Sequence, residues 1–274
     1  MAYKRILTIQ DISCVGQCSM TVAMPILSAC GHETCILPTA VLSTHTGGFG
    51  KPAVTHLDDA LEPIWRHWLE QGISFDAIYT GYLGSVAAVD AAARITENLL
   101  SPGGWLIVDP AMADHGKVYS GLDTAYTAAM AKLCGKADIL IPNLTEAAML
   151  SGMEFREIMD ERYVNRLLDG ISAKTVILTG VGYEQGMTGV AVKQDSERYY
   201  YPHRRVDRNF HGTGDIFAAA FVGALLQGKN GEKAVRIASD YVLRCIDLTV
   251  SAPAHWYGVR FESVLNDLIR MLKE

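Results

Sequence analysis

Short apolar runs alternate with amphipathic stretches along most of this chain, and the alternation limits the folds that it can adopt. A strand is predicted over residues 5–9 and a helix over 19–30, and the pattern repeats up to a strand at 175–178. Strands that alternate with helices in this way form parallel sheets whose faces the helices cover. The sequence therefore predicts an α/β fold with a central, mostly parallel sheet and helices on both faces.

The strands and helices predicted between residues 31 and 174 follow from apolar periodicity and from residues that start and stop helices. Strands are predicted at residues 34–37, 75–79, 105–108 and 138–141. Helices are predicted at 57–71, 85–99, 123–133, 145–151 and 156–168.

The pattern changes after residue 178. Segments 187–192 and 198–201 flank the polar residues 193–197 and predict an antiparallel hairpin at an edge of the sheet. Helices are expected after it, at 211–227, 233–249 and 261–272. No internal repeat, low-complexity tract or linker interrupts the sequence, so we expect one domain over residues 1–274.

Composition and charge exclude several classes of protein. Hydrophobic residues make up 49% of the chain and charged residues 20%, which allows a large core and argues against disorder. The net charge of −6 argues against nucleic-acid and anionic-membrane partners, although one local positive pocket could still hold a phosphorylated ligand. No apolar run approaches the ~18 residues of a membrane span, and residues 1–10 lack the core of a signal peptide. We expect a cytoplasmic protein.

The cysteines do not predict a metal centre. The chain has six of them and no CxxC pair. Cys14 and Cys18 have a spacing that some zinc sites use, but no second pair of matching spacing completes a set of ligands. We expect reduced thiols, as is usual in the cytoplasm.

Polar clusters follow several of the predicted strands. They are Gln10–Asp11, Gly81–Tyr82, residues 109–114 and residues 143–146. Because ligands bind beyond the carboxyl ends of parallel strands, these clusters predict one site at that edge. Each cluster taken alone is equally well explained by capping of the helix that follows.

The strongest local motif is Gly212-Thr213-Gly214-Asp215, which precedes an apolar helix rich in alanine. Glycines allow a tight turn whose N–H groups, together with the helix N-terminus, can bind an anion. Asp215 in the first helical turn can then accept the proton of an attacking hydroxyl group. The alternative is that Asp215 only caps the helix.

Two further segments add to the predicted site. Asn143 and Glu146 are three residues apart at a helix start and suit a hydrated Mg²⁺, although a capping pair would look the same. Asp109 and Asp114 supply further carboxylates at this edge. Residues 39–50, rich in hydroxyl groups and glycine, are interpreted as a loop that folds over a ligand. Motifs of P-loop enzymes, dinucleotide-binding dehydrogenases and α/β hydrolases are absent.

Residues 142–146 (PNLTE) and 212–215 (GTGD) resemble the paired signatures of the ribokinase superfamily. Within it, the chain is most similar to the pyridoxal (pyridoxine, pyridoxamine) kinases. This resemblance extends over nearly the whole chain and rests also on segments 9–16, 43–47, 80–85, 109–110 and 137–143. It implies a ribokinase-like fold and transfer of phosphate from MgATP to the hydroxymethyl group of a vitamin B6 compound, often with K⁺ and in a homodimer.

The resemblance also implies roles for individual residues. Asp215 matches the catalytic base, and Gly212, Thr213 and Gly214 match the anion hole for the transferred phosphate. Glu146, acting on Mg²⁺ mostly through water, and Asn143 match the magnesium motif. Asp109, Asp114 and Thr179 match positions on the nucleotide side. Thr46, Gly47 and Tyr82 are expected on the substrate side, and Asp11 occupies a further substrate position.

Two departures from the family pattern concern the substrate. Asp11 stands where pyridoxal kinases usually have a serine, and Thr44 stands before the loop histidine in place of an asparagine. A carboxylate at position 11 can accept a hydrogen bond from a protonated ring nitrogen or a ring hydroxyl, or it can mark a different substrate. The alternatives are a hydroxymethylpyrimidine kinase, a sugar kinase, which the short lid disfavours, and a non-catalytic B6-binding protein.

Overall fold

The computed structural model describes residues 3–208, 210–252 and 254–274. Its main strands are β1 (Arg5–Ser13), β2 (Glu33–Leu42), β3 (Val54–His56), β4 (Phe75–Thr80), β5 (Leu100–Val108), β8 (Ile139–Leu140), β9 (Thr175–Thr179), β10 (Met187–Gln194) and β11 (Glu197–Arg204). They form one nine-stranded sheet in the order β11-β10-β9-β8-β5-β4-β1-β2-β3. The short strands β6 (Ala113–Asp114) and β7 (Lys117–Val118) form a separate hairpin.

The centre of the sheet is parallel, and only its edges are antiparallel. Strand β1 pairs with β2 and β4, so that Leu7 lies beside both Cys35 and Ile78. The antiparallel pairs are β2–β3 at one edge and β9–β10–β11 at the other. These findings confirm the predicted parallel sheet and the predicted edge hairpin.

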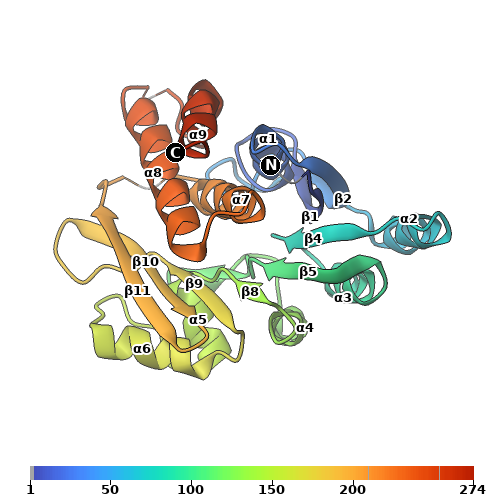
Figure 1. Cartoon of the computed structure of the whole chain (residues 1–274), viewed down its shortest axis with the longest axis horizontal. Helices are drawn as coiled ribbons and strands as arrows, with labels where there is room; N and C mark the ends of the chain where they lie inside the picture. Colours follow the sequence, from blue (N-terminus) through green and yellow to red (C-terminus); the bar gives the residue numbers. More distant parts are fainter. Residues whose placement is uncertain (1–2, 209, 253) are drawn as a thin grey trace.

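Helices cover both faces of the sheet (Figure 1). On one face lie α1 (Met20–Ala29), α7 (Thr213–Leu226), α8 (Gly231–Val250) and α9 (Leu265–Met271). On the other lie α2 (Asp58–Glu70), α3 (Val86–Leu99), α4 (Thr124–Cys134), α5 (Leu144–Ser151) and α6 (Glu161–Gly170).

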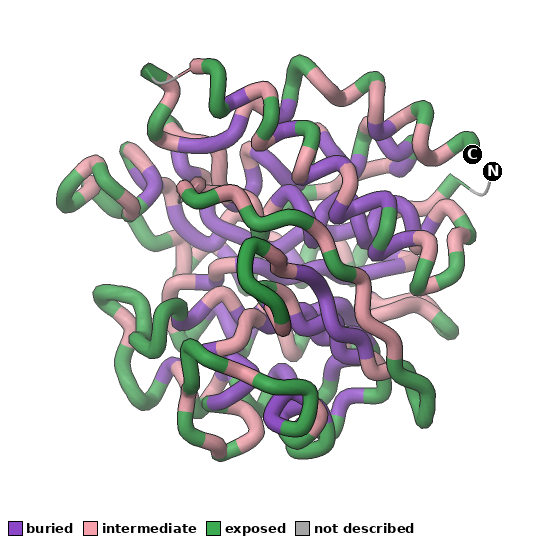
Figure 2. Tube along the Cα trace, turned by 90° about the vertical axis from the view of Figure 1, so that its left-hand side faces the viewer, coloured by how far each residue is buried: buried purple, intermediate pink, exposed green. Residues whose placement is uncertain are grey.

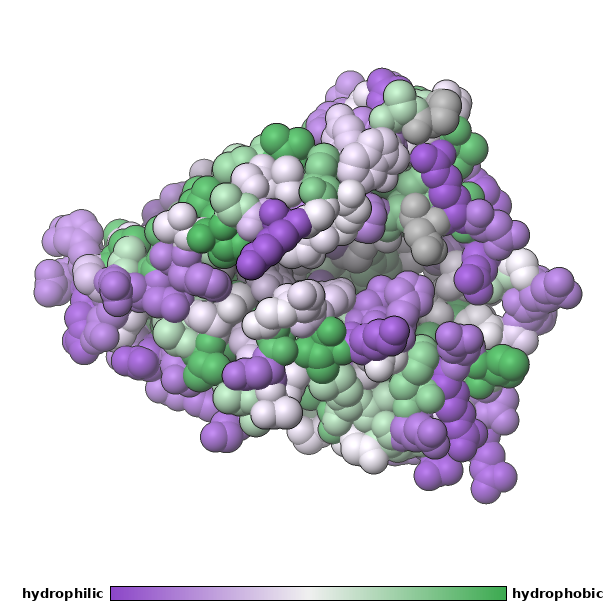
Figure 3. All heavy atoms as spheres, turned by 180° about the vertical axis from the view of Figure 1, so that it is seen from behind, coloured by the Kyte–Doolittle hydropathy of each residue, from purple (hydrophilic) through white to green (hydrophobic). Residues whose placement is uncertain are grey.

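Two hydrophobic cores result, one on each face of the sheet. Buried residues follow the central strands and the inner helix surfaces, whereas the outer connections are exposed (Figure 2). Strand β1 is buried without interruption from Ile6 to Asp11, because helices cover it on both sides. Seen from behind, the molecule has a hollow between its upper and lower halves (Figure 3). Within the described residues, no helix is long and apolar enough to cross a membrane.

Several predicted boundaries were wrong. The helix expected over 156–168 begins only at Glu161, because the Asp160 side chain caps it by accepting a hydrogen bond from the Tyr163 amide at 2.7 Å. The segment expected to be a loop over 39–50 is strand up to Leu42, because β2 gains β1 and β3 as partners there. The last predicted helix starts with a 3₁₀ turn, Glu262–Val264.

Small residues in α7 set how closely it packs against α1. A Cβ atom at Gly223 would lie 2.4 Å from Cys30 Sγ, so the two helices can pack this closely only because residue 223 has no side chain. We predict that Gly223→Ala lowers the free energy of unfolding by about 1–3 kcal/mol through overpacking. Gly135→Ala is the matched control, because Gly135 has a helical φ of −66° and a Cβ there makes only ordinary contacts.

Urea unfolding of the two variants and the parent checks this prediction. The control is expected to change the free energy of unfolding by no more than about 1 kcal/mol, in the stabilising direction. Equal losses in both variants would contradict the packing argument.

Candidate active site

The polar strand ends predicted from the sequence are neighbours in the structure. The Asp11 amide donates to the Tyr82 carbonyl at 3.1 Å, and the Asp109 amide donates to the Thr80 carbonyl at 2.9 Å. The Thr179 amide donates to the Pro142 carbonyl at 3.0 Å. Strands β1, β4, β5, β8 and β9 therefore present their polar residues along one edge of the sheet.

The turn before α7 forms an N–H-rich site at the same edge. Gly212 has a φ of 78°, in the left-handed region that favours glycine, and a Cβ there would lie 1.8 Å from the Gln17 carbonyl oxygen. No side chain within the described part of the chain caps the start of α7. The first amides of this 14-residue helix are thus left to bind an anion, with the helix dipole adding to the attraction.

Asp215 lies in the first turn of α7. The backbone N–H of Ser19, in the connection before α1, lies close enough to this carboxylate to lower its pKa. The pKa of Asp215 is raised to about 7, mainly by burial and in part by the nearby charge of Asp11, while the Ser19 backbone N–H opposes both effects. A carboxylate with a pKa near neutrality is suited to accept a proton.

Ser19 was not identified from the sequence. It is buried, and its φ of 54° is unusual for a residue with a side chain. Its backbone N–H lowers the pKa of Asp215 and its hydroxyl lowers the pKa of Asp11, so it lies beside both carboxylates. The strained backbone at this position fits a site whose geometry is held by its surroundings. No local sequence signal distinguishes it, since serine before a helix is usually only a cap.

Asp11 is 2% exposed at the bulged end of β1. It accepts a hydrogen bond from Ser13 Oγ at 2.9 Å, and burial raises its pKa above the usual value for an aspartate. No arginine or lysine within the described ranges forms an ion pair with it. Because a buried carboxylate without a cationic partner is costly, the site favours a ligand that donates an N–H or carries positive charge.

Asn143 and Glu146 form a reciprocal capping box at the start of α5. Asn143 Oδ1 accepts hydrogen bonds from the amides of Thr145 and Glu146, and Glu146 Oε2 accepts one from the Asn143 amide at 2.9 Å. The capping alternative raised from the sequence therefore describes these contacts correctly.

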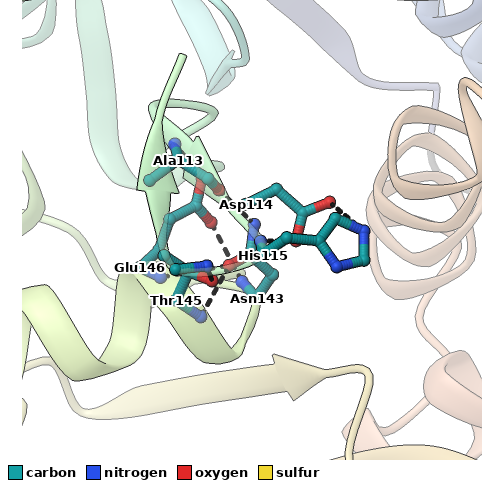
Figure 4. A network of polar contacts seen from close by, with 7 residues as sticks. Ala113, Asp114, His115, Asn143, Thr145 and Glu146 are labelled. Atoms are coloured by element: carbon teal, nitrogen blue, oxygen red, sulfur yellow. Dashed lines mark hydrogen bonds and ion pairs between the residues drawn. The ribbon is translucent and has the colours of Figure 1, made fainter. Parts of the chain in front are cut away.

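The same pair also holds the segment after β5 in place (Figure 4). Glu146, 1% exposed, accepts the Met112 amide at 2.9 Å, and Asn143 Nδ2 donates to the Ala113 carbonyl at 2.7 Å. Thr145, which was not singled out in the sequence, accepts the Gly116 amide through its hydroxyl at 3.0 Å. The capping box thus fixes the segment that carries Asp109 and Asp114.

The carboxylates at this edge raise one another's pKa. Burial raises the pKa of Asp109 well above its usual range, and the charges of Glu146 and Asp215 add to the effect. Burial likewise raises the pKa of Glu146, against the backbone hydrogen bonds that it accepts. A divalent cation bound between these groups would reverse such shifts, so the donor set fits Mg²⁺. Across the residues that the structure describes, no group of three His, Cys, Asp or Glu is arranged to enclose a metal ion.

Some predicted residues lie at the margin of the site. Asp114 is exposed and accepts a hydrogen bond from the His115 amide at 2.8 Å. Thr46 is also exposed, whereas the Gly47 amide is held by His45 Nδ1 at 3.0 Å. Thr179 ends β9, and its hydroxyl donates to the Pro142 carbonyl.

A cavity of about 360 Å³ lies just beyond the end of β9. Gly180, Gly182, Gly186, Thr188 and Arg205 are among the residues that line it. None of them was singled out from the sequence, because the lining comes from the β9–β10 connection, the end of β11 and the stretch before α6. The cavity offers room for a ligand next to Thr179.

Comparison with known proteins agrees with this arrangement. A family model for phosphomethylpyrimidine kinase matches residues 27–258. The pyridoxine/pyridoxal/pyridoxamine kinase of Bordetella bronchiseptica is 28% identical over 259 residues, 90% of each chain.

Two solved structures are closely similar. The pyridoxal kinase of Lactobacillus plantarum superposes with a TM-score of 0.89 at 31% identity over 98% of each chain. A putative phosphomethylpyrimidine kinase of Bacteroides thetaiotaomicron, crystallised with pyridoxal, gives a TM-score of 0.91 at 31% identity over 97% of this chain and 96% of that one.

The sheet order, the N–H-rich turn and these similarities define the protein as an enzyme with the ribokinase-like fold, a phosphotransferase whose acceptor is an alcohol group. The chain belongs to the phosphomethylpyrimidine kinase family.

The two glycines of the turn before α7 are predicted to respond differently to the same substitution. Gly212→Ala places a Cβ against the Gln17 carbonyl and requires a left-handed backbone, so we expect it to lower the free energy of unfolding by about 2 kcal/mol or more. A Cβ at Gly214 would meet no described atom within 4 Å, so Gly214→Ala should change stability by less than about 1 kcal/mol.

Chemical denaturation of both variants measures the difference. If Gly212→Ala is as stable as the parent, the turn can move away from Gln17, and the close contact between Gly212 and Gln17 does not determine the position of the turn.

Proposed function

We propose that the enzyme transfers the terminal phosphate of ATP to the hydroxymethyl group of a vitamin B6 compound: pyridoxal, pyridoxine or pyridoxamine. The observation that carries the proposal is the position of Asp215, a carboxylate with a pKa near 7 in the first turn of a helix whose N-terminal amides no described side chain caps. One helical turn thus supplies a proton acceptor and an anion-binding site side by side.

The proposed reaction follows from this arrangement. The acceptor hydroxyl gives its proton to Asp215 while its oxygen attacks the γ-phosphorus, and the bond from that phosphorus to the bridging oxygen of ADP breaks. The amides of the turn formed by Gly212, Thr213 and Gly214 stabilise the charge on the transferred phosphoryl group. Asp215 then releases its proton to solvent, and the base is restored.

Nucleotide and metal bind on the other side of the proposed site. The cavity beside Thr179 has room for part of ATP, and the pyridoxal kinase of Staphylococcus aureus, 26% identical to this chain, was solved with ADP. Magnesium, when bound, neutralises phosphate charge. Asp109, Asp114 and Glu146 would hold it, mostly through water. K⁺ as an activator, a homodimer and a cytoplasmic location remain predictions from the resemblance and the sequence.

The acceptor is proposed to lie between Asp11, Tyr82 and the loop that carries Thr46 and Gly47. The Bacteroides thetaiotaomicron protein crystallised with pyridoxal supports a B6 compound there. The second candidate is hydroxymethylpyrimidine, which the family description and the buried carboxylate of Asp11 favour, because an aminopyrimidine donates an N–H group.

ATP-dependent phosphorylation of pyridoxal, pyridoxine, pyridoxamine and hydroxymethylpyrimidine, compared side by side with Mg²⁺ and K⁺, tests the proposal. Turnover of a B6 compound well above that of the pyrimidine is expected. Turnover of the pyrimidine alone would overturn the substrate assignment and would leave the base and the anion hole in place.

Asp215→Asn is predicted to lower kcat by about 10²–10⁴-fold, because the amide cannot accept the hydroxyl proton. Dissociation constants of ATP and acceptor should change little, as isothermal titration calorimetry would measure. The folded pKa of Asp215 lies above its usual value, so its ionisation costs stability as pH rises toward 7. The variant should therefore be at least as stable as the parent at pH 8.

Two outcomes would contradict this part of the proposal. A near-normal kcat in Asp215→Asn would show that Asp215 is not the base. Binding of ligands without any turnover by the parent would indicate a non-catalytic B6-binding protein.

The pH profile gives an independent prediction. Since the base must be ionised and burial raises its pKa to about 7, kcat/KM should fall as pH drops below about 7. Asp11→Asn removes a negative charge that raises this pKa, so the acid limb should move to lower pH. Asp59→Asn, an exposed change on α2, should leave the limb where it is. An unmoved limb in Asp11→Asn would contradict the coupling between the two carboxylates.

A further inference from the structure

His45 lies where several segments distant in sequence meet. It is 4% exposed, and its amide donates to the Val15 carbonyl at 3.1 Å in the connection between β1 and α1. A Cβ atom at Gly16 would lie 2.0 Å from its ring. The residue belongs to the segment 43–50, called here the acceptor loop, which joins β2 to the stretch before β3.

Both ring nitrogens of His45 are used. Nε2 lies 2.7 Å from the Tyr257 carbonyl oxygen, and the Gly47 amide donates to Nδ1 at 3.0 Å. Only the neutral ring with its proton on Nε2 satisfies both contacts. Burial and the neighbouring His211 lower the pKa of His45, which favours this neutral form. The ring therefore ties the acceptor loop internally and also ties it to the segment between α8 and α9.

The acceptor loop rests directly on the residue before the anion-binding turn. The His45 and His211 rings are 4.9 Å apart, and a Cβ at Gly47 would lie 2.4 Å from His211 Cε1. His211 is followed at once by Gly212, which packs on the Gln17 carbonyl. A displacement of the loop would thus bear on the turn that carries the proposed phosphate site.

The other end of the loop is held by aromatic contacts. The Phe49 ring lies 4.7 Å from that of Trp256, centroid to centroid, and 5.0 Å from that of His45. A Cβ at Gly48 would lie 2.6 Å from Trp256 Cζ3. Trp256 is 45% exposed, and the loop covers part of the remaining surface of its ring only while the loop stays docked.

We propose that His45 is a positioning residue that fixes the acceptor loop against the anion-binding turn, so that the acceptor hydroxyl and the transferred phosphate are held in one geometry. The inference rests on the proposed function, in which the loop holds the acceptor and the turn holds the phosphate. The bond from Nε2 to Tyr257 is the contact that joins separate segments, whereas the bond at Nδ1 lies within the loop. The coupling therefore depends mainly on Nε2.

Graded substitutions separate the two contacts. His45→Gln keeps an N–H donor at the position of Nε2, which can still bind the Tyr257 carbonyl. His45→Asn keeps an acceptor at the position of Nδ1, which can still bind the Gly47 amide, and His45→Ala keeps neither. His67→Ala, an exposed histidine on α2, is the matched control. For His45→Ala we expect acceptor KM to rise and kcat to fall, each by about tenfold, with the KM for ATP within about twofold of the parent. His45→Gln should recover most of the loss, and His45→Asn should not.

Tryptophan fluorescence measures loop docking without turnover. The emission spectrum of Trp256 is obtained by subtracting, from the spectrum of each protein, the spectrum of the same protein carrying Trp256→Phe. We expect it to shift to longer wavelength in His45→Ala and His45→Asn, and to stay at the parent value in His45→Gln and in the control.

These outcomes test the inference separately from the proposed function. Three outcomes would overturn the inference. They are kcat and KM values of His45→Ala within twofold of the parent, an equal rise in KM for ATP and for the acceptor, and a larger recovery of activity in His45→Asn than in His45→Gln. If His45→Ala does not fold, the Gln and Asn variants still decide between the contacts. A parent that phosphorylates neither substrate class overturns the proposed function, and the fluorescence comparison still shows whether His45 docks the loop.

Discussion

The backbone contact between Gly212 and the Gln17 carbonyl is the constraint on which the site depends. It lets the connection after β1 lie against the start of α7, which places the Ser19 backbone N–H where it lowers the pKa of Asp215. A side chain at position 212 would push these segments apart, and the proposed base would lose its partner. The left-handed backbone at Gly212 also leaves the first amides of α7 facing outward, where they can bind an anion.

Electrostatics at the strand edge give the site its chemistry. Asp11, Asp109, Glu146 and Asp215 are gathered in a poorly solvated region, and burial raises the pKa of each. Such a cluster of carboxylates costs stability unless cations and donors enter it. Burial makes these carboxylates unfavourable on their own. It also strengthens their attraction to a metal-bound nucleotide and to an acceptor that donates hydrogen bonds.

Much of the fold could be predicted from the sequence, because buried parallel strands and amphipathic helices leave distinct periodicities. The sheet, the edge hairpin and the helices on both faces were predicted in this way. The boundaries that failed depend on partners elsewhere in the chain. Residues 39–42 become strand only because β1 and β3 lie beside them, and residues 156–160 stay outside α6 because Asp160 caps it.

The sequence by itself predicted the reaction class and pointed to Asp215 as the base, because the glycines and the aspartate at a helix start are local features and the resemblance to a kinase family gives them a role. It also placed Asp11, Asp109 and Asn143 at strand ends, and parallel strands bring their ends to one edge. Only the tertiary structure decided that Glu146 holds the 112–113 backbone, that Ser19 lies beside both Asp11 and Asp215, and that His45 meets Tyr257 and His211. Those contacts join residues far apart in the chain, and no local pattern encodes the packing of helices and loops that brings them together.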